Sequence, residues 1–295
     1  MEHIIEPIRS ELAQFEAFFS QSLKANTEPM DTIMQYVTET EGKRLRPILV
    51  LLSAKHFGEV NRQTLRAAAF VEMLHTATLI HDDVVDDSDE RRGIASVKAR
   101  FGNLSAVLCG DYLLAKAMLL LSNQSDICIL NEMLGTTAAM SEGELMQGSV
   151  GLSYHGSRNG NRIECGSHDG NRIENGSRNG NRIESGCHDV TALQTQYLDI
   201  ITRKTAMLMR SCCVAGAMSV GATEEQLNHI ADFGINFGIL FQLCDDLLDH
   251  ENVAQAQELL PVYYEKTLKA LEGFPPSEIT ESLRDLTVFC GEREA

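Results

Sequence analysis

The chain has 295 residues, of which 43% are hydrophobic, and this permits a full globular core in one large domain or two small ones. Its formal charge of −17 argues against nucleic acid as a partner, because binding phosphates requires a basic surface. The low aromatic content, the lack of Trp and only 6 Pro favour helices over strands.

The sequence also bears on location. The first residues, Met1 to Glu6, lack the charged-then-apolar order of a signal peptide, and no apolar run approaches the ~20 residues of a membrane span. The 8 cysteines are scattered and none forms a Cys-x-x-Cys pair, which favours reduced thiols. We therefore expect a cytoplasmic protein without a stable membrane anchor.

Apolar residues recur at mainly helical spacing through the first half of the chain. The apolar residues around Ile33 and after Pro47 predict two helices that flank a basic turn. Further helices are predicted over residues 63–87, 104–122 and 126–147.

The basic turn, GKRLRP, carries the cations Lys43, Arg44 and Arg46 immediately before an apolar helix. Arg can bind phosphate through two parallel hydrogen bonds and Lys acts as a point charge, so the turn is a candidate anion site. The alternative is a solvated run of charge. A local cluster of cations in such an acidic chain favours the anion site.

An acidic motif, Asp-Asp-x-x-Asp, ends the helix predicted over 63–87 and recurs at the end of a second apolar stretch. Asp82 and Asp86 are the outer acids of the first copy, and Asp245 and Asp249 those of the second. Residues four apart share one helix face. Two such faces across a cavity would hold Mg²⁺, which binds a few carboxylates together with waters and substrate phosphate oxygens.

Other side chains near these motifs could bind a polyphosphate. They are Lys204, Thr205 and Gln242, whereas Arg91 and Arg92 follow the first motif, where arginines beside acids can mean surface ion pairs. Gln242 shares a helix face with Asp245, three residues later, so it could contact a bound substrate. Gly93, after the two arginines, is expected to stop the preceding helix.

Residues 157–186 are three tandem decapeptides, SRNGNRIECG, SHDGNRIENG and SRNGNRIESG. One Ile in each repeat buries too little apolar surface to offset the entropy lost on ordering the chain. We expect a low-complexity surface loop over about 157–189, with a small turn-rich solenoid as the alternative. Helices are predicted again over 191–250 and, split by Gly273 to Pro276, over 251–295.

Five segments follow one another in the order GKRLRP, LHTATLIHDDVVDDSDERRG, GELMQ, KTA and FQLCDDLLD. They resemble the trans-isoprenyl diphosphate synthase family, also called polyprenyl synthetases, over about residues 5–150 and 191–250. The resemblance implies an all-α, single-domain helical bundle of the isoprenoid synthase type over residues 1–295, built around a deep central cavity and interrupted by the repeat loop. It also implies a homodimer.

The resemblance further implies a role for each motif residue. Mg²⁺ would be bound by Asp82, Asp86 and Asp245, supported by Asp83, Asp246 and Asp249. The allylic diphosphate would be held by Arg91, Lys204, Thr205 and Gln242, and isopentenyl diphosphate by Lys43, Arg46, His75 and Arg92. Lys204, Arg91, Asp82 and Asp86 would be catalytic, because stabilising the departing diphosphate allows the allylic C–O bond to ionise.

Product length has a local determinant in this family. The growing tail passes residues one to two turns before the first acidic motif, which here are Ala77 and Thr78. Short-chain relatives often carry a bulky aromatic residue there, whereas small side chains leave the tunnel open. We therefore predict a long-chain all-trans polyprenyl diphosphate, made by a prenyltransferase from isopentenyl diphosphate and an allylic diphosphate.

Two features depart from the family pattern. The repeat loop falls between GELMQ and KTA, and the stretch after Asp249 lacks a lysine-bearing segment that the family has. The second departure leaves open a non-catalytic or partner subunit. A terpene cyclase is disfavoured by GKRLRP and the two arginines, and a phosphohydrolase or di-iron protein by an incomplete ligand set.

Overall fold

The computed structural model describes residues 2–39, 42–91, 93–155 and 186–292, which form helices and one short strand pair. The first half comprises α1 (Glu2–Ile5), η1 (Glu6–Ile8), α2 (Arg9–Leu23), α3 (Glu28–Glu39), α4 (Leu45–Phe57), α5 (Arg62–Val85), β1 (Glu90–Arg91), β2 (Ile94–Ala95), α6 (Val97–Phe101) and α7 (Asn103–Leu120). The second half comprises η2 (Gln124–Asp126), α8 (Ile127–His155), α9 (Gly186–Ile201), η3 (Thr202–Ala206), α10 (Met207–Ser219), α11 (Glu224–Leu248), α12 (Val253–Ala270) and α13 (Glu278–Gly291).

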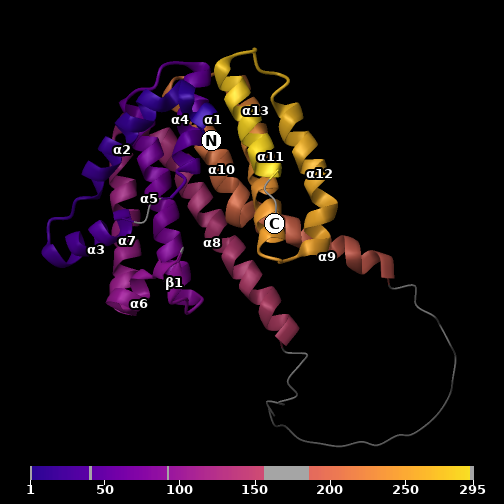
Figure 1. The fold of residues 1–295 in the computed structure, drawn as a ribbon, viewed down its shortest axis with the longest axis horizontal. Helices are drawn as coiled ribbons and strands as arrows, with labels where there is room; N and C mark the ends of the chain where they lie inside the picture. The colour runs from indigo at the N-terminus through magenta and orange to yellow at the C-terminus, as the bar shows by residue number, and fades with distance from the viewer. Residues whose placement is uncertain (1, 40–41, 92, 156–185, 293–295) are drawn as a thin grey trace, which may run out of the picture.

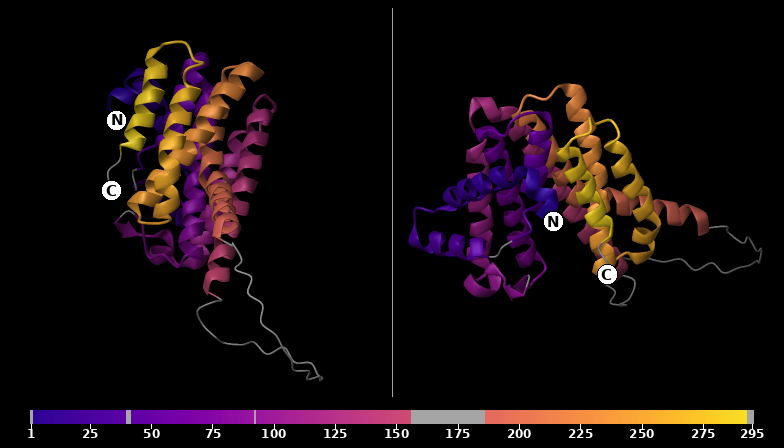
Figure 2. Two further views of the ribbon diagram at one scale, coloured as in Figure 1. Left: turned by 90° about the vertical axis from the view of Figure 1, so that its right-hand side faces the viewer. Right: turned by 45° about the horizontal axis from the view of Figure 1, so that its top comes forward.

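The helices form a bundle, which confirms the predicted all-α class (Figure 1). α2, α3 and α5 to α7 occupy one side, α11 to α13 the other, and α8 and α10 lie between them. Figure 2 shows the two sides from further directions, with the long helices running roughly parallel to one another. The helices predicted over 63–87, 104–122 and 126–147 are confirmed as α5, α7 and α8.

The two helices that carry the acidic motifs, α5 and α11, begin with the same kind of N-terminal cap. The Asn61 side chain accepts hydrogen bonds from the first turn of α5, and the Thr64 hydroxyl accepts one from the Asn61 N–H. Thr223 and Gln226 form the same reciprocal pair at the start of α11. Such capping boxes satisfy backbone N–H groups that have no partner within the helix, so both helices have firm N-terminal ends.

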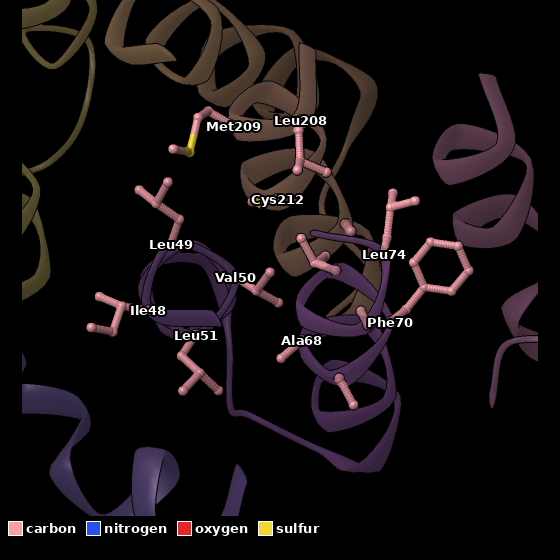
Figure 3. Packing of buried hydrophobic residues seen from close by; sticks show 14 of the residues in the cluster. Ile48, Leu49, Val50, Leu51, Ala68, Phe70, Leu74, Leu208, Met209 and Cys212 are labelled. Atoms are coloured by element: carbon pink, nitrogen blue, oxygen red, sulfur yellow. The ribbon is translucent and has the colours of Figure 1, made fainter. Parts of the chain in front are cut away.

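The core is centred on α4, α5 and α10. Ile48 to Leu52 of α4, Phe70 and Leu74 of α5, and Leu208 and Cys212 of α10 belong to one cluster of buried residues, and Figure 3 shows most of them between and around these three helices. A Cβ atom on Gly216 would lie 2.2 Å from the backbone O of Val50, so this glycine permits close approach of α10 to α4. The helices that carry the candidate site are therefore held by a tightly packed centre.

The strand pair corrects one predicted boundary. α5 ends at Val85, well before Gly93, and Arg91 lies in β1 of a two-stranded hairpin. Gly93 has φ +80° and lies in the turn of this hairpin, a backbone conformation that glycine adopts without strain. The prediction that Gly93 stops the helix was wrong, because Asp87, with φ 54°, already turns the chain away.

Two other predictions meet the boundaries of the described chain. Residues 156–185, most of the predicted repeat loop, lie outside the described residues, and α9 begins at Gly186, so the predicted loop end at 189 was too late. The helices predicted over 191–250 and 251–295 are confirmed, with the break at Gly273 to Pro276 between α12 and α13.

α7 differs from the sequence expectation about apolar runs. By length and composition alone, this helix is long and apolar enough to cross a membrane. A single helix of this kind is weak evidence for a membrane span. The sequence has no uninterrupted apolar run of this length, because Asp111 and Lys116 interrupt the apolar residues of α7. Cys109, Cys128, Cys212 and Cys213 form no disulfide bond, and burial raises the pKa of the Cys109 and Cys213 thiols to about 12.

Candidate active site

Both acidic motifs end their helices with the same backbone geometry. The N–H of Asp86 donates to the carbonyl of Asp82 at 2.8 Å, and the N–H of Asp249 donates to that of Asp245 at 2.9 Å. A residue with positive φ follows each motif, Asp87 at 54° and His250 at 58°. The C-terminal end of a helix carries partial negative charge, so the backbone adds to the attraction of each motif for a cation.

Asp82 is half-buried among charged side chains of both signs. The pKa of this carboxyl is raised to about 6, chiefly by burial and also by the nearby carboxylates Glu144 and Asp86, while Lys204 and Arg91 act in the opposite direction. The raised pKa means that the local cations do not compensate the ionised carboxylate fully. A bound cation would favour the ionised form, so this carboxyl is suited to be one of several ligands of a divalent cation.

Asp83 has a different environment from its neighbour. It is buried, and its Oδ1 accepts a hydrogen bond from Arg91 Nε at 2.7 Å. This ion pair ties the hairpin that carries Arg91 to the end of α5. Arg92, the other predicted ligand on this segment, lies outside the described residues.

In the second motif, Asp246 is buried in a chain of hydrogen bonds. Tyr197 of α9 donates to its Oδ2 at 2.5 Å, and Gln242 donates to its Oδ1 at 2.7 Å. The Thr205 hydroxyl donates to Gln242 Oε1 at 2.6 Å. The two outer acids are more accessible, because Asp245 is half-buried and Asp249 is exposed. The predicted ligands Thr205, Gln242 and Asp246 thus form one connected unit.

Lys204 connects this unit to the first motif. Its Nζ lies 2.7 Å from Glu144 Oε2 and donates to Gln147 Oε1 at 3.0 Å, both on α8. Lys204 belongs to η3, a single π-helical turn between α9 and α10, and such turns are frequent at functional sites. The structure therefore brings Lys204, Asp82 and Glu144 into one electrostatic neighbourhood.

Two cavities border these residues. One of about 320 Å³ is lined by Gln147, Lys204, Gln242 and Asp246, among others. A smaller one of about 90 Å³ lies against α5 and is lined by His75, Asp83 and Arg91, among others. Of the predicted ligands, the larger cavity is therefore lined by Lys204, Gln242 and Asp246, and the smaller one by His75, Asp83 and Arg91.

The cations of the basic turn have different positions. Lys43 is exposed at the lip of an apolar hollow, while Arg46 lies half-buried in the first turn of α4. Arg44 is the third cation of the turn, and no substrate was assigned to it. It forms ion pairs with Glu16 at 3.0 Å and with Glu72 at 2.7 Å. These two ion pairs give Arg44 a structural role within the bundle.

Sequence reasoning missed two residues of this site. Glu144 lies within the GELMQ segment, so the motif itself was the signal that could have identified it. Tyr197 carries no sequence signal, because its partner Asp246 lies 49 residues away. Among the described residues, no group of three His, Cys, Asp or Glu side chains could hold a metal ion by itself.

Comparison with known proteins places this geometry in context. A sequence model of the polyprenyl synthetase family matches residues 27–165 and 170–258. Octaprenyl diphosphate synthase of Haemophilus influenzae is 33% identical over 221 residues, covering 75% of this chain and 56% of that protein. The Escherichia coli octaprenyl diphosphate synthase is 29% identical over 250 residues, covering 85% of this chain and 66% of that protein. The chain thus spans less than two thirds of these relatives.

A third relative matches from end to end. Heptaprenyl diphosphate synthase component 2 of Geobacillus stearothermophilus is 25% identical, and the match covers 97% of each protein. Among solved structures, a polyprenyl synthase of Caulobacter crescentus, complexed with calcium and isoprenyl diphosphate, has a TM-score of 0.79 at 24% identity. That match covers 100% of this chain and 98% of the other, and it shows a shared fold.

Proposed function

This chain belongs to the polyprenyl synthetase family, and we propose that it is a prenyltransferase that condenses isopentenyl diphosphate with an allylic diphosphate. The observation that carries the proposal is the position of Asp82, a half-buried carboxyl within electrostatic reach of the cations Lys204 and Arg91 and of a second motif acid, Asp86. A site that places acids and cations side by side is suited to a metal-bound diphosphate, because the acids can bind the metal and the cations the phosphate oxygens.

The metal would be Mg²⁺, held by Asp82, Asp86, Asp245 and Asp249. Asp83 and Asp246 would support these ligands without contacting the metal, because both are buried and already accept hydrogen bonds from protein donors. When bound, Mg²⁺ would supply positive charge that stabilises the departing diphosphate.

The protein side chains would position two substrates. Lys204, Arg91, Thr205 and Gln242 would hold the allylic diphosphate, and Lys43, Arg46, His75 and Arg92 would hold isopentenyl diphosphate. The allylic C–O bond breaks, the double bond of isopentenyl diphosphate forms the new C–C bond, and a proton is lost to the released diphosphate. The Lys204–Glu144 pair would open so that Lys204 can bind phosphate oxygens.

The product would be a long-chain all-trans polyprenyl diphosphate. Three of the relatives are named for eight- or seven-unit products, and the positions before the first motif, Ala77 and Thr78, are small. Thr78 is half-buried, whereas Ala77 has no exposed surface and packs in the core. Of these two positions, Thr78 would therefore line the path of the tail.

The chain would act as a single isoprenoid synthase domain in a cytoplasmic homodimer. The exposed apolar residues of α7 and α8 support self-association, because a second copy could cover them. They include Leu104, Leu108, Leu119 and Leu145, which are 75%, 51%, 69% and 76% exposed.

A partner subunit is the second candidate function. One relative is named as a component of its enzyme, and its match runs over 347 positions, more than this chain has residues. α12 begins at Val253, only four residues after Asp249. A chain that lacks a segment near the site could need another subunit for turnover.

Substitution of the two leading acids tests the metal assignment. Asp82→Ala and Asp245→Ala should each lower kcat at saturating Mg²⁺ by at least about 100-fold, as removal of transition-state charge stabilisation does. Asp232→Ala is the matched control, since Asp232 is an exposed acid on α11. Near-normal turnover by either motif variant would reject the assignment.

A further inference from the structure

His81 immediately precedes Asp82, the first candidate metal ligand, and its side chain contacts α7. The helices α5 and α7 lie side by side (Figure 1). The Nε2 atom of His81 lies 3.2 Å from the carbonyl oxygen of Val107 and 3.4 Å from Asp111 Oδ1. A carbonyl oxygen can only accept a hydrogen bond, so Nε2 carries a hydrogen and donates it. His81 therefore links the end of α5 to α7.

Gly110 of α7 makes room for the imidazole ring of His81. A Cβ atom at Gly110 would lie 2.2 Å from His81 Nε2, 2.6 Å from Cδ2 and 2.8 Å from Cε1. These distances are shorter than van der Waals contact, so a methyl group at this position would force the ring to move. A glycine inside a helix costs about 0.5–1 kcal/mol relative to alanine. The packing of His81 gives a physical reason for a glycine inside α7.

Asp82 lies between two anchored side chains at the end of α5. Successive residues of an α-helix are turned by about 100° around its axis, so His81 and Asp83 flank Asp82 on its two sides. Asp83 pairs with Arg91 of the hairpin at 2.7 Å, and His81 donates to α7. The last turn of α5 is thereby held on both sides. Asp86, four residues after Asp82, shares its helix face and depends on the same two anchors.

We propose that His81 is a positioning residue that orients Asp82 towards the metal through its contacts with Val107 and Gly110. The inference rests on the proposed Mg²⁺-dependent prenyltransfer and adds a residue that acts on a metal ligand from the side of α7. Groups that fix the orientation of a metal ligand typically change metal affinity about 10- to 100-fold when they are lost. Without the His81 contact, Asp83 alone would anchor the last turn of α5, so Asp82 would bind the metal less well.

The variants His81→Ala and His81→Gln test this role. The purified proteins would be assayed with isopentenyl diphosphate, farnesyl diphosphate and varied Mg²⁺, and their thermal melts would be recorded. His81→Ala should raise the Mg²⁺ concentration for half-maximal turnover about tenfold. Glutamine can place an N–H at a reach similar to that of Nε2, so His81→Gln should restore most of the normal Mg²⁺ requirement. A lower melting temperature with an unchanged Mg²⁺ requirement in His81→Ala would show a merely structural role.

The variant Gly110→Ala tests the same contact from the side of α7. The added methyl group would displace the intact imidazole, so this variant should also raise the Mg²⁺ requirement. In the His81→Ala background there is no ring to displace, so Gly110→Ala should change the requirement further by less than about twofold. The matched control is Gly135→Ala in α8, an exposed position where a Cβ atom meets nothing within 4 Å, and it should behave like the unaltered protein.

The outcomes separate the positioning role from the proposed function. Mg²⁺-dependent turnover by the unaltered protein, with the same Mg²⁺ requirement in His81→Ala and Gly110→Ala, would overturn the positioning role alone. Fully additive effects of the two substitutions would mean that they act independently, which would also overturn it. An absence of turnover in the unaltered protein would reject the proposed function, and the positioning role with it.

Discussion

Lys204 and Glu144 form an ion pair across η3 and α8, with Nζ and Oε2 2.7 Å apart. Glu144 also adds to the negative field at Asp82. One carboxylate therefore competes with a diphosphate for Lys204 and repels the ionised form of a predicted metal ligand. The resting site is held by protein contacts that a substrate must replace.

Glu144→Gln should strengthen binding of the allylic diphosphate. Lys204 would lose its ionic partner, and partly exposed ion pairs contribute about 0.2–1 kcal/mol, which corresponds to a KM lower by a factor of about 1.4 to 5. Steady-state kinetics with varied allylic substrate would measure the change. Glu142→Gln, which removes an exposed partner of Arg203, is the control. A higher KM in Glu144→Gln alone would mean that Glu144 itself contacts the substrate.

Tyr197→Phe should weaken the second motif without unfolding the protein. Asp246 would lose its 2.5 Å hydrogen bond from Tyr197, and a hydrogen bond to a charged group contributes about 1.5–3 kcal/mol. We expect the Mg²⁺ concentration for half-maximal turnover to rise about tenfold, because the end of α11 would be less well oriented. Tyr263→Phe, in α12, should leave the Mg²⁺ requirement unchanged. Equal effects of both substitutions would contradict a specific role for Tyr197.

Bulky substitution before the first motif should shorten the product through Thr78 more cleanly than through Ala77. Thr78→Phe would project into partly open space, whereas Ala77→Phe would overpack a wholly buried position at a cost of about 1–3 kcal/mol. Product analysis with thermal melts would separate the two effects. If Thr78→Phe gave the normal length at the normal rate, the tail would follow another path.

Acid should destabilise the fold through His56. Burial lowers the pKa of this imidazole, which packs against Phe57 and Phe274. The unfolded chain then binds more protons, so stability is fully present above the ordinary pKa of about 6.5 and is lost as pH falls through it towards the folded pKa. Urea melts from pH 7.5 to 5 would show the loss. His56→Phe should reduce it, and an unchanged slope would assign the acid sensitivity to other groups.

Charge on the apolar face of α7 should disrupt self-association. Leu104→Glu/Leu108→Glu would place two carboxylates among residues that a second copy would desolvate, and uncompensated buried charges are strongly unfavourable. Analytical ultracentrifugation should show a dimer for the unaltered chain and a monomer for the variant. Val262→Glu, on the exposed face of α12, is the control. A monomeric unaltered chain would contradict the dimer.

The sequence predicted the helices well because their signals are local. Apolar periodicity located α5, α7 and α8, and the Gly273 to Pro276 break separated the last two helices. The apolar pattern could not predict the hairpin that carries Arg91, because strands of two residues are too short to show a periodicity. Nor could it predict that Asp83 and Asp246 are buried while their neighbours are more accessible, because that depends on Arg91 and Tyr197 arriving from other segments.

The most direct test of prenyl transfer is turnover by the purified chain alone. The assay would combine isopentenyl diphosphate, farnesyl diphosphate and Mg²⁺, with chelator-treated protein as the metal-free reference. The proposed function predicts Mg²⁺-dependent incorporation into a ladder that ends in a long polyprenyl diphosphate. A folded protein that binds a farnesyl diphosphate analogue with Mg²⁺ but incorporates no isopentenyl diphosphate would contradict it and favour the partner subunit.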